Sequence, residues 1–222
     1  MCNKIDICMD FMIKWFQCVV NIQTESHTQI AKCQNQEVSI MYTGKNPSAL
    51  RSRVEIVQAF LGLIQTTTFE KLQIKQLMDA TGLTRQTFYQ IFKNKEEILE
   101  YYLDTLFAEF VSHAEKREIT TLCDAAEFFF AFFSEYREPL GVILRNGKSC
   151  VVQRKCREYL YNSHYLHYEL KGADTPEQVE YATTFLVSGM VAMLEQWLRT
   201  GSQVPSGELA RLICRITGSP EK

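Results

Sequence analysis

Residues 84–95 bring together side chains that could contact the bases and phosphates of DNA. Gln86 has a carboxamide that can pair bidentately with adenine, and Arg85 has a guanidinium that can do so with guanine. Hydroxyl, phenol and ammonium groups nearby could contact the sugar–phosphate backbone. The candidate DNA-binding residues are Thr84, Arg85, Gln86, Thr87, Tyr89, Gln90, Lys93 and Lys95. For the two lysines, solvated surface charge is the alternative interpretation.

A helix that ends in a glycine turn is predicted just before these residues. Ile74, Leu77 and Met78 have the i, i+3, i+4 spacing that gives a helix one apolar face. Glycine readily adopts the left-handed backbone that is needed directly after a helix end. We therefore expect a helix that ends near Thr81 and turns sharply at Gly82.

A second short helix is predicted to carry the polar side chains. The hydroxyl of Thr84 can accept a hydrogen bond from a backbone N–H in the first turn of residues 85–92. Phe88 and Phe92 share an inward face with Leu83, and polar residues occupy the other faces. Such a surface suits the major groove, where base edges present distinct donors and acceptors. The pattern by itself fits an ordinary helical hairpin equally well.

The sequence around the two helices resembles the TetR family of bacterial transcription regulators. T-G-L-T-R-Q-T-F-Y at residues 81–89 and F-K-N-K-E-E-I-L at residues 92–99 carry the resemblance, which is tight over roughly residues 51–102. The resemblance implies an all-α protein. In the family, an N-terminal three-helix head with a helix-turn-helix binds DNA, and a helical body binds an effector and dimerises.

The resemblance also implies residue roles. Thr87, Tyr89 and Lys95 match positions at which the family contacts the DNA backbone, with Lys95 directed at phosphate from the start of the next helix. Gln86 is the foremost candidate for base contact. At Ile91 many relatives carry histidine, which puts a backbone contact at this position in doubt but not the fold.

Positive charge is concentrated in the same part of the chain. Residues 45–95 contain eight basic and three acidic residues, a net charge of +5. The whole chain has a formal net charge of −2, so the remainder sums to −7. This distribution argues against a nonspecific nucleic-acid coat and for a local surface that meets phosphate. A DNA-binding domain is therefore expected at residues 45–95.

Length and composition predict a helical protein with a substantial core. The chain has 222 residues, 46% of them hydrophobic, with long helical periodicities and no convincing alternating strand pattern. Nucleotide-binding, hydrolase and zinc-protease motifs are missing from it, so the sequence predicts no catalytic residue, no cofactor and no metal site. A cytoplasmic location is expected, without membrane association.

Eight cysteines are present without C-x-x-C or zinc-type spacing. Reduced thiols are therefore the expectation for all of them. A redox-sensing role for Cys150 and Cys156 is less favoured than inert packing, because six residues apart on one helix they would point to different faces.

Residues 1–44 are predicted to be an extension. Met9, Met12, Phe16 and Val20 belong to an amphipathic stripe that charged residues interrupt and that is too short to cross a bilayer. Three interpretations remain: a packing appendage, a membrane-surface helix, or translated sequence upstream of the natural start. We favour the last, with Met41 as the natural start, which N-terminal mass spectrometry of the protein from its own cell would test.

Residues 96–222 are predicted to form the effector-binding and dimerisation domain. The chain's long helices are expected, in order, at residues 95–115, 121–136, 139–147, 149–170, 176–201 and 205–216. The last two have apolar stripes wider than one core requires, and in the family two such helices from each chain form a four-helix bundle. A homodimer through these helices is therefore expected, and Gly189 could allow close helix approach.

Aromatic side chains fill the predicted body and allow two interpretations. Stripes of Phe and Tyr at helical spacing are more often core than ligand site. Phe interleaved with Tyr and His also suits an effector pocket with apolar walls and a few orienting groups. The candidate effector residues are Phe107, Phe110, Phe129, Phe133, His164, Tyr165 and Tyr168. A metal at His164 and His167 is less favoured, because no third ligand lies nearby in the sequence.

The sequence predicts a DNA-binding transcription regulator. The favoured form is a repressor that binds a palindromic double-stranded DNA operator as a dimer and releases it when a small molecule binds the body. The alternatives are an activator of the same fold, and a helical ligand-binding protein or enzyme with no DNA role.

Overall fold

The computed structural model of the chain describes residues 47–162 and 175–218, with side chains through residue 159 in the first range. Both ranges belong to the second of two units, Met1–Ile40 and Met41–Lys222. The predicted extension at residues 1–44, and His164, Tyr165 and Tyr168, lie outside the described residues. Within the described ranges all regular structure is α-helical, as the sequence predicted. The predicted domain boundaries stay predictions.

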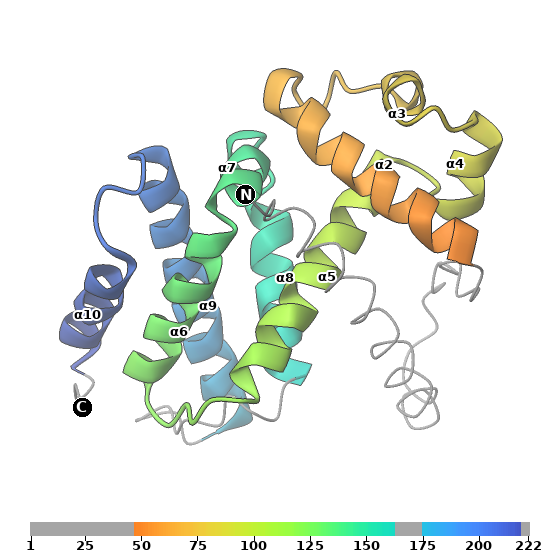
Figure 1. The fold of residues 1–222 in the computed structure, drawn as a ribbon. Helices are drawn as coiled ribbons and strands as arrows, with labels where there is room; N and C mark the ends of the chain where they lie inside the picture. The colour runs from red at the N-terminus through yellow and green to blue at the C-terminus, as the bar shows by residue number, and fades with distance from the viewer. Residues whose placement is uncertain (1–46, 163–174, 219–222) are drawn as a thin grey trace. The chain divides into compact units, whose positions relative to one another are not determined.

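Three helices form the head, and a fourth leads out of it (Figure 1). They are α2 (Pro47–Thr66), α3 (Ile74–Thr81), α4 (Arg85–Ile91) and α5 (Lys95–Ala114). The apolar faces of α2, α3 and α4 pack on one another, and α2 also packs on α5. Leu77, Phe88 and Ile98 are fully buried in this core.

The turn chemistry predicted for the head is present. Gly82 has φ +70° and its N–H donates to the carbonyl of Met78 at 2.9 Å, which ends α3. The hydroxyl of Thr84 accepts from the N–H of Thr87 at 3.1 Å and starts α4. The two helices of the predicted helix-turn-helix therefore begin and end where the sequence placed them.

The buried stripe of α2 differs in part from the predicted one. The helical spacing of Val54, Val57, Leu61 and Ile64 predicts that these residues face the core, and the buried apolar residues are Ile56, Val57, Phe60 and Ile64. Val54 and Leu61 are half-buried on the flank. Apolar residues at both sets of positions make the helix period ambiguous, and the structure turns the larger side chain of Phe60 inward, where its ring meets Phe69 edge-on at 5.9 Å.

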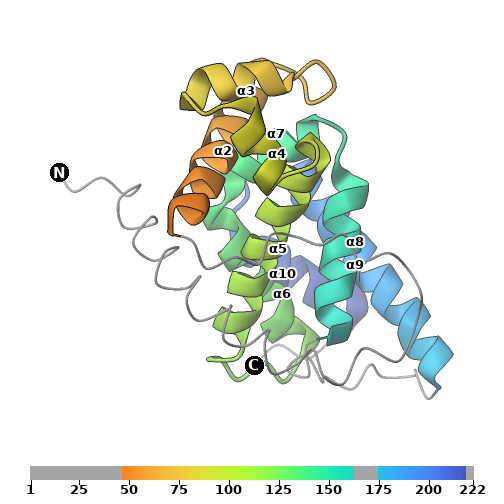
Figure 2. The same cartoon turned by 90° about the vertical axis from the view of Figure 1, so that its right-hand side faces the viewer.

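The described residues of the body form five further helices. They are α6 (Leu122–Glu135), α7 (Arg137–Arg145), α8 (Ser149–Asn162), α9 (Pro176–Arg199) and α10 (Ser206–Thr217). Helix α8 lies between α5 and α9 (Figure 2), and α10 packs along α6. The predicted helices agree with these bounds within a few residues, except that the predicted helix at 149–170 runs beyond residue 162, where the described range ends.

The inward face of α9 was misplaced by the sequence. By their spacing, the residues expected on this face are Val179, Ala182, Leu186, Gly189, Met190, Met193 and Trp197. The buried residues are Val187, Val191, Leu194 and Trp197. Most of the predicted residues lie half-buried on the flank of α9. Small and apolar residues occur on several faces of this helix, so the pattern alone does not determine which face is buried.

A covalent link between α6 and α10 corrects the expectation of reduced thiols. Cys123 and Cys214 form a disulfide, with Cα atoms 5.4 Å apart. Cys150 and Cys156 are free, the first exposed and the second buried. No spacing pattern indicated this pair, because 91 residues separate its members and only the fold brings them together.

Candidate nucleic-acid interface

Helix α4 turns its polar side chains outward, as the sequence predicted. Phe88 is fully buried and Ile91 is 6% exposed, so one face of the helix is fixed in the head core. Tyr89 is 58% exposed. The other candidate residues with exposed side chains are Thr84, Arg85, Gln86, Gln90 and Lys93. One continuous helical surface therefore offers carboxamide, guanidinium, phenol and ammonium groups to a partner.

Thr84 and Thr87 are joined at the start of this surface. Their hydroxyl oxygens lie 2.9 Å apart, and Thr84 also caps the helix by accepting from the N–H of Thr87. Thr87 is half-buried, and its hydroxyl is already oriented by its neighbour. This pair fixes where α4 begins, and so sets the direction in which Arg85 and Gln86 project.

Lys95 lies at the start of α5, as predicted, and contacts the α2–α3 turn. Its Nζ donates to the carbonyl oxygens of Phe69 at 2.6 Å, Glu70 at 2.9 Å and Leu72 at 3.3 Å. Its ammonium also lies 4.9 Å from the centroid of the Phe69 ring. An ammonium has three hydrogens, and three carbonyls already accept them. This geometry gives Lys95 a structural role in holding the α2–α3 turn, and its phosphate contact stays a prediction.

Arg53 is buried and does not contribute to the exposed positive surface. It is 4% exposed, and its guanidinium lies over the ring of Tyr101 at 5.0 Å from the centroid. Burial raises the pKa of Tyr101, and the nearby Arg53 partly offsets this. The +5 charge counted from the sequence therefore overstates what phosphate can meet. The exposed cations among the described head residues are Arg51, Lys71, Lys75, Arg85 and Lys93.

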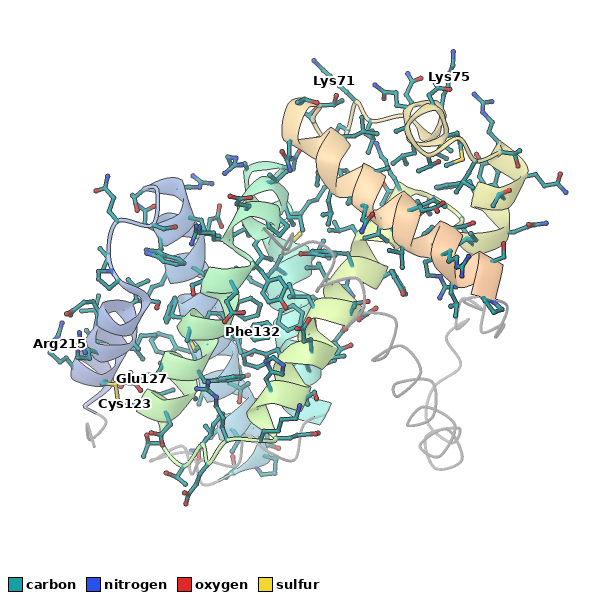
Figure 3. All side chains as sticks on the ribbon, in the orientation of Figure 1. Lys71, Lys75, Cys123, Glu127, Phe132 and Arg215 are labelled. Carbon is teal, nitrogen blue, oxygen red and sulfur yellow. A yellow bond between two sulfur atoms is a disulfide. The ribbon has the colours of Figure 1, made fainter. Side chains whose placement is uncertain are left out.

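Lys71 and Lys75 extend outward from the head at the start of α3 (Figure 3). Ile91, where many TetR relatives carry histidine, points the other way and is buried. A backbone contact from position 91 is therefore unavailable in this chain, and phosphate contact would have to come from the exposed residues around α3 and α4.

A hydrogen-bonded junction joins the α2–α3 turn to the body. The N–H of Phe69 donates to Oδ1 of Asn146 at 2.6 Å. The Nδ2 of Asn146 donates to the carbonyls of Val142 at 2.9 Å and Ile64 at 3.4 Å. Lys148 pairs with Glu70 at 3.1 Å and lies 4.0 Å from the centroid of the Phe69 ring. The turn between α7 and α8 thus contacts the head directly.

An ionic cluster provides a second connection, between α5 and α8. The Nζ of Lys155 lies 2.7 Å from Asp104, 3.2 Å from Glu100 and 3.3 Å from Glu158. Arg154 also pairs with Glu100 and Glu158. Burial raises the pKa of Asp104, although Lys155 opposes this. Burial would lower the pKa of Lys155, but the hydrogen bond and charge of Asp104 and the other carboxylates raise it overall.

The described effector candidates form a closely packed cluster. Phe107, Phe110, Phe129 and Phe133 are all buried. The centroid of the Phe133 ring lies 5.5 Å from that of Phe107 and 4.6 Å from that of Phe129. Phe132 joins them from the same helix (Figure 3). This packing favours the core interpretation, since a ligand would have to displace at least one ring.

Sequence reasoning missed the residues that connect parts of the fold. Asn94 caps α5 by accepting from the N–H of Glu97 at 2.9 Å, and its position directly before an acidic first turn was a usable signal. Asn146 and Lys148 had no comparable signal, because the head residues that they contact, Phe69 and Glu70, lie more than 70 residues away in the sequence. Within residues 47–162 and 175–218, no cluster of His, Cys, Asp and Glu could hold a metal ion. Nor does any helix there have the length and apolar character needed to cross a membrane.

Comparison with solved structures places the fold. A TetR transcriptional regulator from Streptococcus agalactiae 2603V superposes with a TM-score of 0.61 at 19% identity, over 77% of this chain and 95% of that one. The chain has the fold of the TetR regulators. The fatty acid degradation regulator FadR from Bacillus halodurans gives a TM-score of 0.55 at 15% identity, over 78% of this chain and 96% of that one. The dihydroxyacetone kinase operon activator DhaS gives 0.53 at 16% identity, over 77% and 96%.

Sequence comparison gives a shorter match. The chain is 28% identical over 75 residues to the HTH-type dhaKLM operon transcriptional activator DhaS of Lactococcus lactis subsp. lactis (strain IL1403). The match covers 34% of this chain and 40% of that relative's length. No protein-family model matches the chain. These similar proteins are transcription regulators rather than enzymes, in agreement with the absence of catalytic motifs from the sequence.

Proposed function

We propose that the chain is a DNA-binding transcription regulator in which α4 lies in the major groove. The observation that carries this proposal is the exposed polar face of α4 on a buried Phe88 and Ile91. Gln86 and Arg85 stand in the first turn, where they can pair with base edges. Tyr89, Thr87 and Lys93 flank them and would contact the DNA backbone.

The test is DNA binding by the full chain. Duplexes that tile the DNA flanking its own gene are titrated with the protein, and fluorescence anisotropy gives the affinity of each. We expect one duplex to be bound at least about a thousandfold more tightly than scrambled DNA. Equal affinity for every duplex would contradict sequence-specific regulation, and no binding at all would favour a ligand-binding role without DNA.

We propose repression as the regulatory outcome, because an operator-bound dimer blocks a promoter without needing a further contact. Activation is the second candidate, since the similar DhaS proteins are named as operon activators. A reporter gene behind the bound duplex distinguishes the two. Expression that falls when the chain is supplied supports repression, and expression that rises supports activation.

A homodimer through α9 and α10 follows from their outward faces. Tyr181 and Phe185 on α9 are 77% and 73% exposed, and Ile216 on α10 is 68% exposed. Exposed apolar side chains of this size on both helices are typical of protein–protein contacts. A Cβ added to Gly189 would meet nothing within 4 Å in this chain, so this glycine leaves room for a partner helix. A symmetric dimer would present two heads to a palindromic operator.

Control by a small molecule would act through the two connections between the head and the body. The junction at Asn146 and the ionic cluster at Lys155 both join head-linked segments to body helices. A molecule that separates the aromatic rings around Phe107 and Phe133 would shift α5 against α6 and α8. By reciprocity, such a ligand binds the DNA-bound form less tightly if it weakens DNA binding.

A further inference from the structure

Cys123 and Cys214 bring a chemistry to the body that DNA binding does not use. Their Cα separation of 5.4 Å lies within the range of ordinary disulfides. The bond joins the first turn of α6 to the last turns of α10 (Figure 3). Both side chains are buried, at 5% and 2% exposure. The fold therefore holds these two thiols in position to react with each other.

A transcription regulator acts in a compartment where thiols are normally reduced, so a disulfide in it points to redox sensing. The inference therefore rests on the proposed function. Cytosolic cysteines of most organisms are kept reduced, and disulfides that form there are usually transient or redox-sensing. The two free cysteines of the described residues lack such a partner. Cys156 is buried in the middle of α8, away from a helix end that could open, and burial raises the pKa of its thiol.

The helix that the bond fastens is one of the two proposed for dimerisation. On its inner side Ala210 and Ile213 are buried, beside Cys214. On its outer side Leu212 and Ile216 are exposed. The bond therefore fixes how α10 presents its outer side. Cys214 stands one turn from the end of the helix, where opening of the last turn gives an oxidant or reductant access to the sulfur.

We propose that Cys123 and Cys214 form a reversible redox switch that responds to peroxide, and that the disulfide form binds DNA more tightly. One thiolate attacks hydrogen peroxide, becomes a sulfenic acid and releases hydroxide. The second thiol attacks the sulfenic sulfur, so that the S–S bond forms and the sulfenic oxygen leaves as water. In sum, two thiols and one peroxide give one disulfide and two waters. A dithiol reductant restores both thiols by exchange and becomes a disulfide itself.

The disulfide changes the affinity for DNA through its effect on dimerisation. In the disulfide form α10 is tied to α6, so ordering its outer side costs little when a second chain binds. In the thiol form α10 is held by packing alone and opens more often. Association of two chains then costs more ordering entropy, and the paired heads bind two half-sites less tightly.

The test compares the two states of the full chain. Protein is reduced with dithiothreitol and desalted, and half is treated with hydrogen peroxide before free thiols are alkylated. Peptide mapping should show a Cys123–Cys214 link in the treated half. Anisotropy titrations on the bound duplex should give an affinity roughly 5- to 150-fold higher for the disulfide form. This difference should disappear in Cys214→Ala and Cys123→Ala and persist in Cys150→Ala, the matched control at a free, exposed thiol.

Three outcomes would overturn the switch: no Cys123–Cys214 link after peroxide, equal affinity in both states, or the same difference in Cys214→Ala. Failure to bind DNA in either state would instead count against the proposed function. The switch is then decided by hydrogen exchange, which should be slower in α10 of the disulfide form. Equal exchange in both forms would overturn it, and this comparison on the wild-type chain needs no variant to fold.

Discussion

The backbone N–H of Phe69 donates to Oδ1 of Asn146 at 2.6 Å, and this bond joins the α2–α3 turn of the head to the α7–α8 turn of the body. The side chain of Asn146 has no freedom to move away, because its Nδ2 donates to the carbonyl of Val142 at 2.9 Å. Phe69 is itself buried, under the ammonium groups of Lys95 and Lys148. A displacement of the α7–α8 turn would therefore move the segment that leads into α3 and α4.

Replacement of Asn146 should destabilise the chain. In Asn146→Ala the N–H of Phe69 loses its acceptor in a part-buried place, at a cost of about 1–3 kcal/mol. Asn146→Asp keeps an acceptor for Phe69 but places a carboxylate oxygen against the carbonyls of Val142 and Ile64, so it should also be destabilised. Urea unfolding followed by circular dichroism measures both variants. Equal midpoints for Asn146→Ala and the wild type would show that the junction contributes nothing.

Replacement of Lys95 should change stability, whereas replacement of Lys93 should change the salt dependence of DNA binding, although the sequence predicted that both contact DNA. Lys95→Met keeps the apolar stem but removes three charged hydrogen bonds, each worth about 1.5–3 kcal/mol at most, so stability should fall. The salt dependence of DNA binding should keep its slope. Lys93→Met should leave stability unchanged and reduce that slope by about one. A reduced slope in Lys95→Met with unchanged stability would support its predicted phosphate contact.

Gln86→Ala should weaken binding at one base position. The carboxamide is exposed in the first turn of α4, and loss of a bidentate pair costs about 1–3 kcal/mol at the base that it contacts. Titration of single-base variants of the operator locates this base, because the variant protein no longer distinguishes it. Gln65→Ala, at an exposed position near the end of α2, is the control and should bind every duplex as the wild type does. Uniform weakening across all duplexes would contradict base contact by Gln86.

Phe185→Glu should separate the proposed dimer. Phe185 is 73% exposed in the single chain, so the change should leave the fold of the chain intact. Loss of a buried phenylalanine from each chain costs roughly 1.5–3 kcal/mol, and a carboxylate in an apolar contact adds to that cost. Sedimentation velocity should show monomers, while Phe185→Leu stays dimeric. A dimer of unchanged affinity in Phe185→Glu would place the contact elsewhere.

Lys155→Met should make stability depend more strongly on pH. The change leaves Asp104 beside Glu100 and Glu158 without their shared cation, and loss of that cation raises the pKa of Asp104 further. A carboxyl group whose pKa is higher in the folded than in the unfolded chain destabilises the folded chain as the pH rises through the acidic range. The stability deficit against the wild type should be small near pH 4 and grow toward pH 7. It should stay below the roughly 3–5 kcal/mol of fully buried pairs, because the carboxylates are partly exposed.

Thermal or urea unfolding of both proteins across this pH range measures the deficit. Lys148→Met removes a single pair between a half-buried lysine and the exposed Glu70, and serves as the control with the smaller pH dependence. A deficit for Lys155→Met that is constant from pH 4 to pH 7 would show that packing of the lysine stem, rather than its charge, matters at this site.

Local chemistry made the head predictable. Gly82, Thr84 and Phe88 each have a role that depends on neighbours within four residues, so residue type and spacing were enough to place α3, the turn and α4. The same holds for most helix bounds of the body, which follow caps such as Thr121 and Thr175.

Long-range partners made the remainder unpredictable. The count of positive charge included Arg53 and Lys95, and the fold turned one under Tyr101 and the other onto three carbonyls. The disulfide between Cys123 and Cys214 likewise joins residues whose spacing carries no information. In each case the decisive neighbour comes from another element, which a pattern along the sequence cannot reveal.

Binding of DNA through α4 is the central claim, and one titration tests it most directly. Full-length wild type and Arg85→Ala/Gln86→Ala are titrated by anisotropy against the duplexes that tile the gene's own flanks. We expect the wild type to select one duplex at least about a thousandfold over scrambled DNA, and the double variant to lose most of that selection. A wild type that selects no duplex, or a double variant that selects as well as the wild type, would contradict the account.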